Sequence, residues 1–515
     1  MNLTHITYML ERNSHKYPDK AAIISSQEQI TYRHYQNRVY RLANALRRLG
    51  VKKGDRVSTL FYNSPEQLIT YMAVFQLGAI LVPLNFRLSL PEYLFILNSS
   101  EASLLICGEE FTELADKIHR NTSQIKNIIV SGQEKSVPDF IGWEELLVAE
   151  TDELPSETLD DEDSLYILYT SGTTGRPKGA VITNKNLIWN SLNGVISGVL
   201  SGDEVVFYGL PLFHGAAMGG YFATALLGGT VVLEKSFDPA KTFSLVQKEK
   251  ITVIPAVPAM LRAFLNLPDR DRYDLSSLKC FSTGATVVPQ ALKQELRKAF
   301  PNIGIVDSYG LTEATSYVTI LPEKDFLRKE SCVGLPHAFV EIRIVDEQNR
   351  DVKTGEIGEI LVRGPNIMKE YFNDPEATAE TIIDGWLHTG DMGKRDEEGY
   401  LYVVDRKKDM IISGGENIYP REIEELLHTH PKIEDVAVIG VPDDRWGETV
   451  KAVVVLKKGE ALSKEDLIAF CRERLAHYKC PRHIDFVKEL PKTSTGKIIK
   501  RVIRERHGGI TMRPY

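Results

Sequence analysis

Apolar and polar positions alternate with two different periods along the first two thirds of the chain. Short runs rich in β-branched residues predict strands at 103–107, 126–130, 165–168, 204–208 and 230–233, and longer amphipathic stretches predict helices at 36–49 and 289–300. Strands that are separated by helices are typical of α/β layers with largely parallel sheets. We therefore expect an α/β architecture for this part of the chain.

The pattern changes between residues 340 and 404. Apolar runs at 341–345 and 359–363 are accompanied by glycine-containing turns at Thr354-Gly355 and Glu398-Gly399. Short runs joined by such turns predict a mostly antiparallel β segment.

A smaller unit follows from about Asp409. Its predicted elements are a helix that begins at 420–427, strands at 436–439 and 451–456, and a helix at 464–475. This order indicates a compact α+β unit. The only boundary signal before it is a run of five charged residues at 405–409, which is usually a solvated turn. The tail from His507 to Tyr515 is expected to be a loose terminus.

The most apolar stretch, 68–84, has a composition that membrane-spanning helices also show. Gln76 and Gly78 interrupt it. A buried helix from about Pro65, capped near Gly78 and followed by a strand at 80–82, explains it better. The N-terminus has no basic segment followed by an apolar core, so we expect neither a signal peptide nor a transmembrane segment.

Length and composition narrow the class of protein. With 515 residues, the chain is too long for one ordinary core, and its 43% hydrophobic and 26% charged residues are typical of a soluble globular protein. The formal net charge of −8 disfavours non-specific binding to nucleic acid. Five cysteines without a CxxC pair favour free thiols in a reducing compartment, the cytoplasm, over disulfides or a structural zinc site. They are Cys107, Cys280, Cys332, Cys471 and Cys480.

The most informative segment is YTSGTTGRPKG, residues 169–179, directly after the strand predicted at 165–168. Its three glycines let backbone amides turn around an anion, and Lys178 adds a positive charge for phosphate oxygens. Hydroxyl donors come from Thr170, Ser171, Thr173 and Thr174. The Gly-Lys-Ser/Thr ending of a Walker A loop is missing. Judged by composition alone, a polar surface turn explains the segment equally well.

As a complete string, this segment resembles the phosphate-binding loop of the adenylate-forming superfamily, which contains acyl- and aryl-CoA synthetases, adenylation domains and luciferases. Further motifs follow in the family's order between residues 17 and 504, and fatty-acyl- or aryl-CoA ligases are the most similar members. The resemblance implies a large N-terminal domain, 1–405, of two α/β subdomains plus a β-barrel. It also implies a small, mobile α+β C-terminal domain, 409–515, that rotates about a hinge near Lys408.

The second motif is YGLTE, residues 309–313. The resemblance implies that the Tyr309 ring stacks on adenine, that Thr312 contacts phosphate and that Glu313 holds Mg²⁺, a hard cation suited to carboxylate oxygen. Asp307 stands where the family reaches the adenine amino group. The other nucleotide-binding positions implied are Gly172, Gly175, Gly284, Ala285, Ser308 and Gly310.

Two later motifs complete the implied ATP site. Asp391, in LHTGD, accepts hydrogen bonds from the ribose, and Arg406 contacts ribose or phosphate. Lys497, in PKTSTGKI, bridges the carboxylate, the α-phosphate and the leaving oxygens, which is electrostatic catalysis. Taken one at a time, these residues are also explained as an Asx turn, a charged turn and a surface lysine.

The resemblance extends to a site for the acceptor thiol, coenzyme A. The glycine loop Ser413, Gly414 and Gly415 is presented to the thiol channel, and it also fits a turn before a helix that begins at Pro420. Trp446, Tyr478 and Arg482 match positions that hold coenzyme A, although both aromatic residues also fit a packing role. Many relatives carry a basic residue where this chain has Cys480.

Positions that line the acid pocket in relatives correspond to 213–221, 283–286 and 312–317. The first two segments are small and mostly apolar here, without a basic residue for a second carboxylate or an acidic residue for an α-amino group. Such a lining suits a fatty chain or an aryl ring. His214 either gates this site as a catalytic residue or packs against it.

The sequence thus predicts an ATP-dependent acid–CoA ligase. It would convert a monocarboxylic acid, fatty or aromatic, into acyl-AMP with release of pyrophosphate and pass the acyl group to coenzyme A. The alternative is a stand-alone adenylation enzyme that loads a carrier-protein thiol. A luciferase-like oxidase has no supporting feature, and a non-catalytic binding protein would be expected to lack Lys497 or Glu313. A homodimer and a transient contact with a membrane surface stay open.

Overall fold

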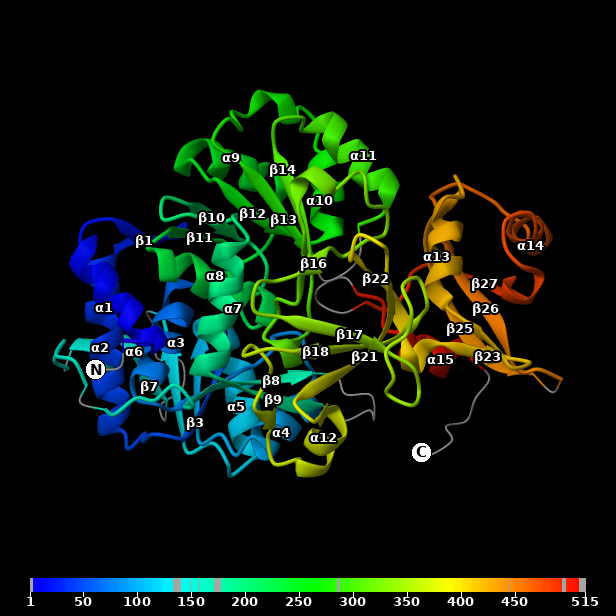
Figure 1. Ribbon diagram of the computed structural model, residues 1–515. Coiled ribbons are helices and arrows are strands. Elements are labelled where there is room, and N and C mark those ends of the chain that lie inside the picture. The colour runs from blue at the N-terminus through cyan, green and yellow to red at the C-terminus, as the bar shows by residue number, and fades with distance from the viewer. Residues whose placement is uncertain are drawn as a thin grey trace.

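The computed structural model describes residues 3–132, 140–148, 150–155, 157–170, 177–284, 288–443, 445–492 and 497–508. Its strands form two large sheets, a smaller antiparallel sheet and a further sheet near the C-terminus. Figure 1 shows the large sheets and their helices as the main body, with the last sheet and its helices to one side. The predicted α/β class, with a large N-terminal part and a small C-terminal part, is confirmed.

The first large sheet has the order β19-β9-β8-β4-β3-β5-β6-β7. Its strands are β3 (Arg56–Leu60), β4 (Ile80–Pro83), β5 (Leu104–Gly108), β6 (Asn127–Ser131), β7 (Ile141–Gly142), β8 (Ser164–Thr170), β9 (Lys178–Thr183) and β19 (Glu370–Tyr371). Strands β8, β4, β3, β5, β6 and β7 are parallel to their neighbours, and β9 and β19 add an antiparallel edge. The predicted strands at 103–107, 126–130 and 165–168 correspond to β5, β6 and β8.

The second large sheet has the order β16-β15-β14-β13-β12-β10-β11-β1-β2. Its strands are β1 (Ala21–Ile24), β2 (Gln29–Thr31), β10 (Val205–Tyr208), β11 (Thr230–Leu233), β12 (Val253–Ala256), β13 (Cys280–Gly284), β14 (Gly304–Tyr309), β15 (Thr319–Leu321) and β16 (Leu335–Pro336). The six strands from β14 to β1 are parallel. The predicted strands at 204–208 and 230–233 correspond to β10 and β11.

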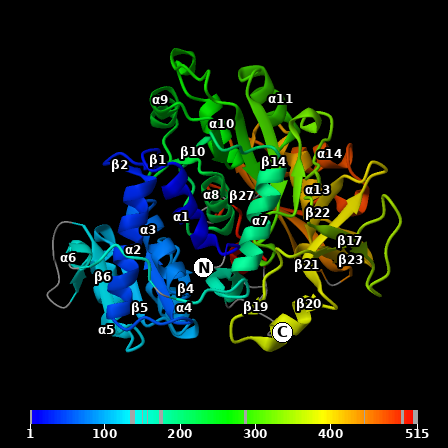
Figure 2. The ribbon, with the colours of Figure 1, turned by 60° about the vertical axis from the view of Figure 1, so that its left-hand side comes forward.

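One core joins the two large sheets. Besides strand residues of both sheets, it contains residues of α2 (Tyr32–Arg48), α3 (Pro65–Gln76), α7 (Asn184–Ile196) and α8 (Gly215–Leu227). Figure 2 shows α2 and α3 running together. Every residue of α3 except Glu66 is buried, which explains why this helix is apolar on all sides. The helix and strand predicted for 68–84 are confirmed as α3 and β4.

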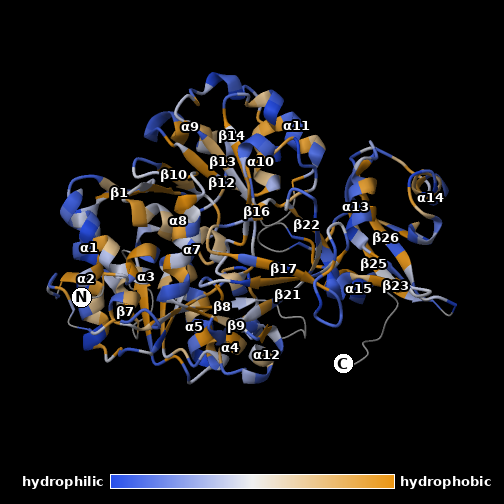
Figure 3. Ribbon diagram, viewed as in Figure 1, coloured by the Kyte–Doolittle hydropathy of each residue, from blue (hydrophilic) through white to orange (hydrophobic). Residues whose placement is uncertain are grey.

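The remaining helices of the main body cover its outer faces. They are α1 (Ile6–Lys16), α4 (Leu90–Ser99), α5 (Thr112–Asn121), α6 (Trp143–Val148), α9 (Pro239–Glu249), α10 (Pro258–Leu265), α11 (Gln290–Ala299) and α12 (Pro375–Thr381). Figure 3 shows hydrophobic positions gathered on the strands and hydrophilic ones on the outer turns of these helices. In the part of the chain that the structure describes, no helix has both the length and the apolarity needed to cross a bilayer.

The third sheet is antiparallel, as the sequence predicts for 340–404. Its strands are β17 (Glu341–Val345), β18 (Gly358–Arg363), β20 (Ile382–Ile383), β21 (Trp386–Arg395) and β22 (Leu401–Arg406). β21 pairs with β18, β20 and β22. The family resemblance implies a β-barrel here, whereas the described strands pair as an open sheet in the order β17-β18-β21-β20, with β22 beside β21.

The C-terminal sheet contains β23 (Ile411–Ser413), β24 (Glu416–Ile418), β25 (Ile433–Asp443), β26 (Gly447–Leu456) and β27 (His483–Val487). Helices α13 (Pro420–His428) and α14 (Lys464–Arg472) share a core on one face, and α15 (Lys500–His507) packs on the other. The predicted α+β pattern is confirmed. The loose tail was predicted to begin at His507, which is one residue too early, because His507 ends α15 and its Nδ1 lies 3.0 Å from Asp485 Oδ2. Residues 509–515 lie outside the described part of the chain.

Candidate active site

Three of the predicted nucleotide-binding residues form one hydrogen-bonded group where β14 meets the third sheet. The Tyr309 hydroxyl donates to Asp391 Oδ2 at 2.6 Å, and Arg406 Nε lies 2.6 Å from Asp391 Oδ1. Asp391 and Arg406 are register partners on β21 and β22, so strand pairing alone brings them together. Burial and the Asp391 carboxylate raise the pKa of Tyr309, which therefore stays a neutral donor.

Lys497 comes from the C-terminal unit and joins this group. Its side chain is open to solvent, but neighbouring protein displaces much of the surrounding water. That loss of hydration, together with the Arg406 charge, lowers the pKa of Lys497 to about 8, although Asp391 partly opposes both effects. Residues 493–496, which precede Lys497 in its motif, lie outside the described part of the chain.

Glu313 and the two residues that flank the phosphate loop meet at a second point. Thr170 and Lys178 are register partners on the antiparallel strands β8 and β9, which the loop connects. Glu313 Oε1 accepts a hydrogen bond from the Tyr371 hydroxyl at 3.0 Å and a long one from Thr170 Oγ1 at 3.4 Å. Lys178 Nζ lies 5.2 Å from the centre of the Tyr371 ring. The loop residues Ser171, Gly172, Thr173, Thr174 and Gly175 lie outside the described ranges.

Asp307 is buried at the end of β14, and one of its oxygens is unpaired. The Ser308 amide donates to Oδ1 at 3.0 Å, whereas Oδ2 has no partner among the described residues. Burial raises the pKa of Asp307 to about 6, although Lys293, a buried residue of α11, partly opposes this. A buried acceptor without a partner is costly in the absence of a ligand, so Asp307 suits an amino group brought by a nucleotide.

Two glycines of the predicted site are required by close backbone contacts. A Cβ atom on Gly310 would lie 1.4 Å from the Ser316 carbonyl oxygen, and one on Gly284 would lie 2.8 Å from the Ser308 carbonyl oxygen. Thr312 begins a short 3₁₀ helix, Thr312–Ala314, that carries Glu313. Ala285 lies outside the described ranges.

His214 stands at the start of α8. Its ring lies 4.4 Å from that of Phe213, and burial together with Arg87 lowers its pKa to about 4. The imidazole is therefore neutral near pH 7. α8 carries the small residues that the sequence assigns to the acid pocket.

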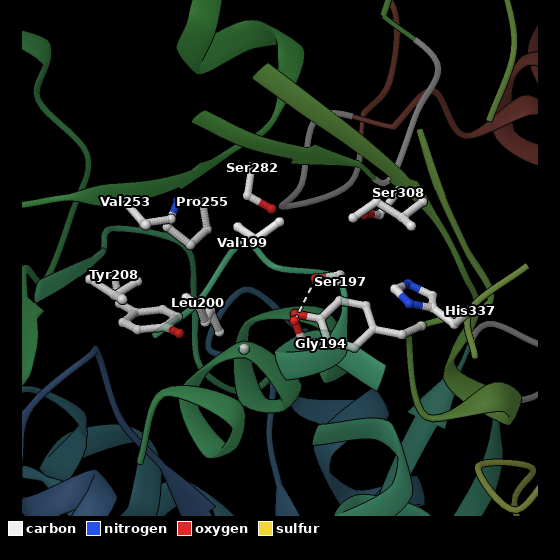
Figure 4. Close-up of a pocket in the computed structure, with 14 residues that line it drawn as sticks. Gly194, Ser197, Val199, Leu200, Tyr208, Val253, Pro255, Ser282, Ser308 and His337 are labelled. Carbon is white, nitrogen blue, oxygen red and sulfur yellow. Dashed lines mark hydrogen bonds between the residues drawn. The ribbon is translucent and has the colours of Figure 1, made fainter. Parts of the chain in front are cut away.

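A cavity of about 430 Å³, counting the part open to solvent, lies beside this site. Ser308, next to Asp307 and Tyr309, lines it, and so do Gly220 and Tyr317, which belong to the segments 213–221 and 312–317. Figure 4 shows Tyr208 and His337 at opposite sides of the space. The complete lining is Gly194, Ser197, Val199, Leu200, Val206, Tyr208, Gly220, Val253, Pro255, Ser282, Ser308, Tyr317, Ile320 and His337.

The residues predicted to hold coenzyme A gather in the C-terminal unit. The Gly414 amide donates to the Trp446 carbonyl at 2.8 Å, and Ser413 pairs with Gly447. The Arg482 guanidinium lies 5.3 Å from the centre of the Trp446 ring. In Figure 1, β23 lies on the side of this unit that is remote from the large sheets.

Three further positions complete this part of the site. Gly415 has a φ of 89°, which favours glycine, and Tyr478 is 42% exposed on a short 3₁₀ helix. Cys480 is buried, and its thiol lies 3.6 Å from the Ala476 carbonyl oxygen. The departure from the family at Cys480 thus falls in the core of the unit rather than on its surface. All five cysteines are free thiols, as predicted.

Two residues of the site were missed in the sequence. Tyr371 reaches Glu313 because β19 adds to the edge strand β9, a pairing between segments almost 200 positions apart. His337 follows β16 and reaches the cavity through the fold of the second sheet. Neither residue stands in a recognisable motif, so no local signal could have found them.

Comparisons with known proteins agree with this geometry. Residues 10–372 match the family model described as AMP-binding enzyme, and residues 422–497 match the AMP-binding enzyme C-terminal domain. A feruloyl-CoA synthase of an Amycolatopsis species is 42% identical, over 96% of this chain and 98% of that protein. An indoleacetate–CoA ligase of Aromatoleum aromaticum is 40% identical over 96% and 97%. A long-chain fatty-acid–CoA ligase of Mycobacterium tuberculosis is 36% identical over 98% and 99%.

Solved structures are similar over almost the whole chain. An anthranilate CoA ligase in complex with anthranoyl-AMP has a TM-score of 0.88 at 30% identity, covering 98% of this chain and 97% of that one. An o-succinylbenzoate CoA synthetase of Bacillus subtilis, in complex with ATP and a magnesium ion, has a TM-score of 0.85 at 31% identity, covering 96% and 98%.

Proposed function

The chain belongs to the AMP-binding enzyme family, and from this membership we propose how its residues carry out the family's reaction. It is an ATP-dependent acid–CoA ligase, which converts a carboxylic acid into an acyl-adenylate and transfers the acyl group to coenzyme A. ATP, Mg²⁺ and coenzyme A are its cofactors and co-substrates. Our assignment of residues rests on one observation: Lys497 of the C-terminal unit lies close enough to the Asp391–Arg406 pair for their charges to change its pKa.

In the first half-reaction, the acid's carboxylate attacks the α-phosphorus of ATP and pyrophosphate leaves. Asp391 holds the ribose hydroxyls while Tyr309 and Arg406 keep its carboxylate in place, which is supported by the 2.6 Å contacts on both of its oxygens. The unpaired Oδ2 of Asp307 accepts the adenine amino group. The Lys497 ammonium stabilises negative charge that develops around the α-phosphate.

Thr170, Lys178 and the loop between them hold the outer phosphates, and Thr312 assists. Glu313 would hold Mg²⁺ through its carboxylate, since this hard cation prefers oxygen ligands. In the described part of the chain, no three acidic, histidine or cysteine residues gather as a metal-binding cluster. When bound, Mg²⁺ supplies neutralisation of phosphate charge.

In the second half-reaction, we propose that the C-terminal unit rotates about Lys408, with the domains at 1–405 and 409–515. Rotation withdraws Lys497 and brings the loop 413–415 to the adenylate. The remote position of β23 in Figure 1 supports a separate state for thiol transfer. Trp446, Tyr478 and Arg482 then hold coenzyme A, whose thiol displaces AMP. Neutral His214 at the start of α8 gates the entrance.

We propose that the acid is an aromatic monocarboxylic acid. The relatives at 42% and 40% identity are named for feruloyl-CoA and indoleacetate, whereas the long-chain fatty-acid ligase is 36% identical. A cavity walled by the Tyr208 and Tyr317 rings also suits a flat body.

We further propose a cytoplasmic location, where free thiols are stable. A homodimer and a transient membrane contact stay predictions.

The residue assignment is tested by Lys497→Ala in separated half-reactions. Formation of acyl-AMP should fall at least 100-fold, because one charged group that stabilises the transition state supplies roughly 3–4 kcal/mol. Acyl transfer from supplied acyl-AMP to coenzyme A should persist, because Lys497 has left the site by then. Lys492→Ala is the matched control, since Lys492 lies five positions earlier and pairs with Asp435 at 2.6 Å. Equal losses in both half-reactions would overturn the two-state assignment.

A further inference from the structure

One buried histidine faces the cavity beside the nucleotide site. His337 is 6% exposed, lines the cavity, and its Nε2 has no hydrogen-bond partner among the described residues. Figure 4 shows its ring turned toward the space between Ser308 and Ser197. A buried polar atom without a partner costs free energy unless a ligand completes it.

A hydrogen bond at the other ring nitrogen of His337 determines which nitrogen carries the proton. A hydrogen bond with the Asn193 backbone raises the pKa of the imidazole, so the ring donates and the Asn193 carbonyl accepts. Because Nε2 has no partner among the described residues, we infer that Nδ1 is the donating nitrogen. Burial nevertheless lowers the pKa of His337 to about 4, and the ring is neutral near pH 7. With its single proton on Nδ1, the neutral ring presents Nε2 as an acceptor. A second hydrogen bond, which the Phe339 amide donates to Asn193 Oδ1 at 3.2 Å, holds the segment that contains His337 against α7.

Two of the hydroxyl groups that line the cavity differ from His337 Nε2. The Ser197 hydroxyl donates to the Gly194 carbonyl, and the Tyr208 hydroxyl is 3.2 Å from Thr224 Oγ1. Both therefore have partners within the protein. Val199, Leu200, Val253 and Pro255 make much of the remaining wall apolar. The remaining polar side chains of the lining are the hydroxyls of Tyr317, Ser282 and Ser308, so His337 supplies its only imidazole and a buried nitrogen acceptor without a partner among the described residues.

The chamber borders the residues assigned to the nucleotide, so we infer that it is the space for the body of the acid. Ser308 lines it and directly precedes Tyr309, whose hydroxyl is bonded to Asp391. A Cβ atom on Gly220 would lie 3.1 Å from the Tyr208 hydroxyl and 3.4 Å from the Tyr317 hydroxyl, so the absence of a side chain there keeps the chamber open.

We propose that His337 is a specificity-determining residue whose Nε2 accepts a hydrogen bond from a hydroxyl or N–H group on the aromatic body of the acid. The substrate class is then aromatic acids that carry such a donor, rather than unsubstituted aryl acids or fatty acids. This inference rests on the proposed function, since it assigns part of the acid site of the ligase. An acid without a donor fills the same space but leaves Nε2 buried and unpaired, which disfavours its transition state.

The test compares acids of matched shape. Wild-type enzyme is given MgATP, coenzyme A and either 4-hydroxycinnamic or 4-methylcinnamic acid, then the 3-hydroxy and 3-methyl pair, and decanoic acid. Acyl-CoA is quantified, and kcat/KM is compared within each pair. We expect at least one hydroxy acid to exceed its methyl partner by roughly 10- to 100-fold, the usual effect of one buried unpaired polar atom.

Variants assign this preference to His337. In His337→Leu the preference should shrink to less than about threefold while kcat/KM for the methyl acid is kept or rises. His337→Gln, whose amide oxygen also accepts, should restore part of it. The control is Phe339→Leu, because Phe339 is 38% exposed and packs on Trp189 rather than lining the cavity. This variant should keep the full preference.

The outcomes separate the inference from the function beneath it. If wild-type enzyme forms no acyl-CoA from any acid, the proposed function fails. If acyl-CoA forms but hydroxy and methyl acids are used equally, or if His337→Leu keeps the preference, the role of His337 is wrong and the ligase assignment stands. Decanoic acid used better than every aromatic acid would overturn the substrate class alone.

Discussion

The depressed pKa of Lys497 leads to a quantitative prediction for the first half-reaction. Its pKa is about 8 instead of 10.5, first because neighbouring protein displaces water around the ammonium group and then because of the Arg406 charge. A lysine whose pKa is lowered loses its charge as the pH rises through the lowered value. At pH 7 about 90% of Lys497 is protonated, and at pH 9 about 10%, so kcat/KM for ATP should fall about tenfold between these values. With an ordinary pKa, about 97% would remain protonated at pH 9.

The assay is acid-dependent exchange of pyrophosphate with ATP in the absence of coenzyme A, followed from pH 6 to 10. The quantity to plot is kcat/KM for ATP, because it reports groups of the free enzyme. Lys408→Gln should move the alkaline limb to higher pH, since the Lys408 charge also lowers the pKa of Lys497. Lys407→Gln should leave the limb in place, because Lys407 pairs with Glu359 at 2.9 Å. It is the matched control at the neighbouring position.

A flat profile to pH 10 would refute this reasoning, because it would mean that Lys497 keeps an ordinary pKa or takes no part in adenylation. The same conclusion follows if Lys407→Gln and Lys408→Gln shift the limb equally. Acyl transfer from supplied acyl-AMP gives an internal check, since Lys497 should impose no alkaline limb on that step.

Two further predictions concern buried contacts of the site. Asp307→Asn should raise the free energy of unfolding by about 2.5 kcal/mol more at pH 8 than at pH 4. Asp307 has a pKa of about 6 in the folded protein and 3.8 in the unfolded chain, so the stability that its neutral form contributes is fully present below 3.8 and is lost as the pH rises through 6. Urea titrations at the two pH values measure this, and equal effects would contradict it. Tyr371→Phe removes the 3.0 Å hydrogen bond to Glu313 and should weaken the apparent affinity for MgATP by roughly tenfold. A Mg²⁺ titration of adenylation checks it, and an unchanged midpoint would contradict a role for Tyr371 in orienting Glu313.

Local patterns predicted secondary structure well where a short segment consists only of apolar or β-branched residues. The run at 230–233 is apolar or β-branched throughout and is β11. The helix expected at 36–49 begins at Tyr32 instead, because the Thr31 hydroxyl accepts from the His34 amide and starts the helix earlier. The helix expected at 464–475 ends at Arg472, since apolar spacing alone does not mark the last turn.

The sequence predicted only those site residues that stand in recognisable motifs. Asp391, Arg406 and Tyr309 stand in motifs, and the structure adds how they support one another. The roles of Tyr371 and His337 depend on pairings between distant segments, so their partners Glu313 and Asn193 cannot be read from neighbouring residues. The lowered pKa of Lys497 likewise arises only when the two parts of the chain come together.

The central claim is that one enzyme makes an acyl-adenylate and then passes the acyl group to coenzyme A. A single-turnover experiment with enzyme in excess, an aromatic acid and MgATP, quenched and resolved by mass spectrometry, tests it directly. We predict bound acyl-AMP and one equivalent of pyrophosphate before coenzyme A is added, and equal amounts of acyl-CoA and AMP afterwards. Release of ADP and phosphate, or acyl-AMP that coenzyme A fails to consume, would contradict the claim, and the second result would point to a carrier-protein thiol.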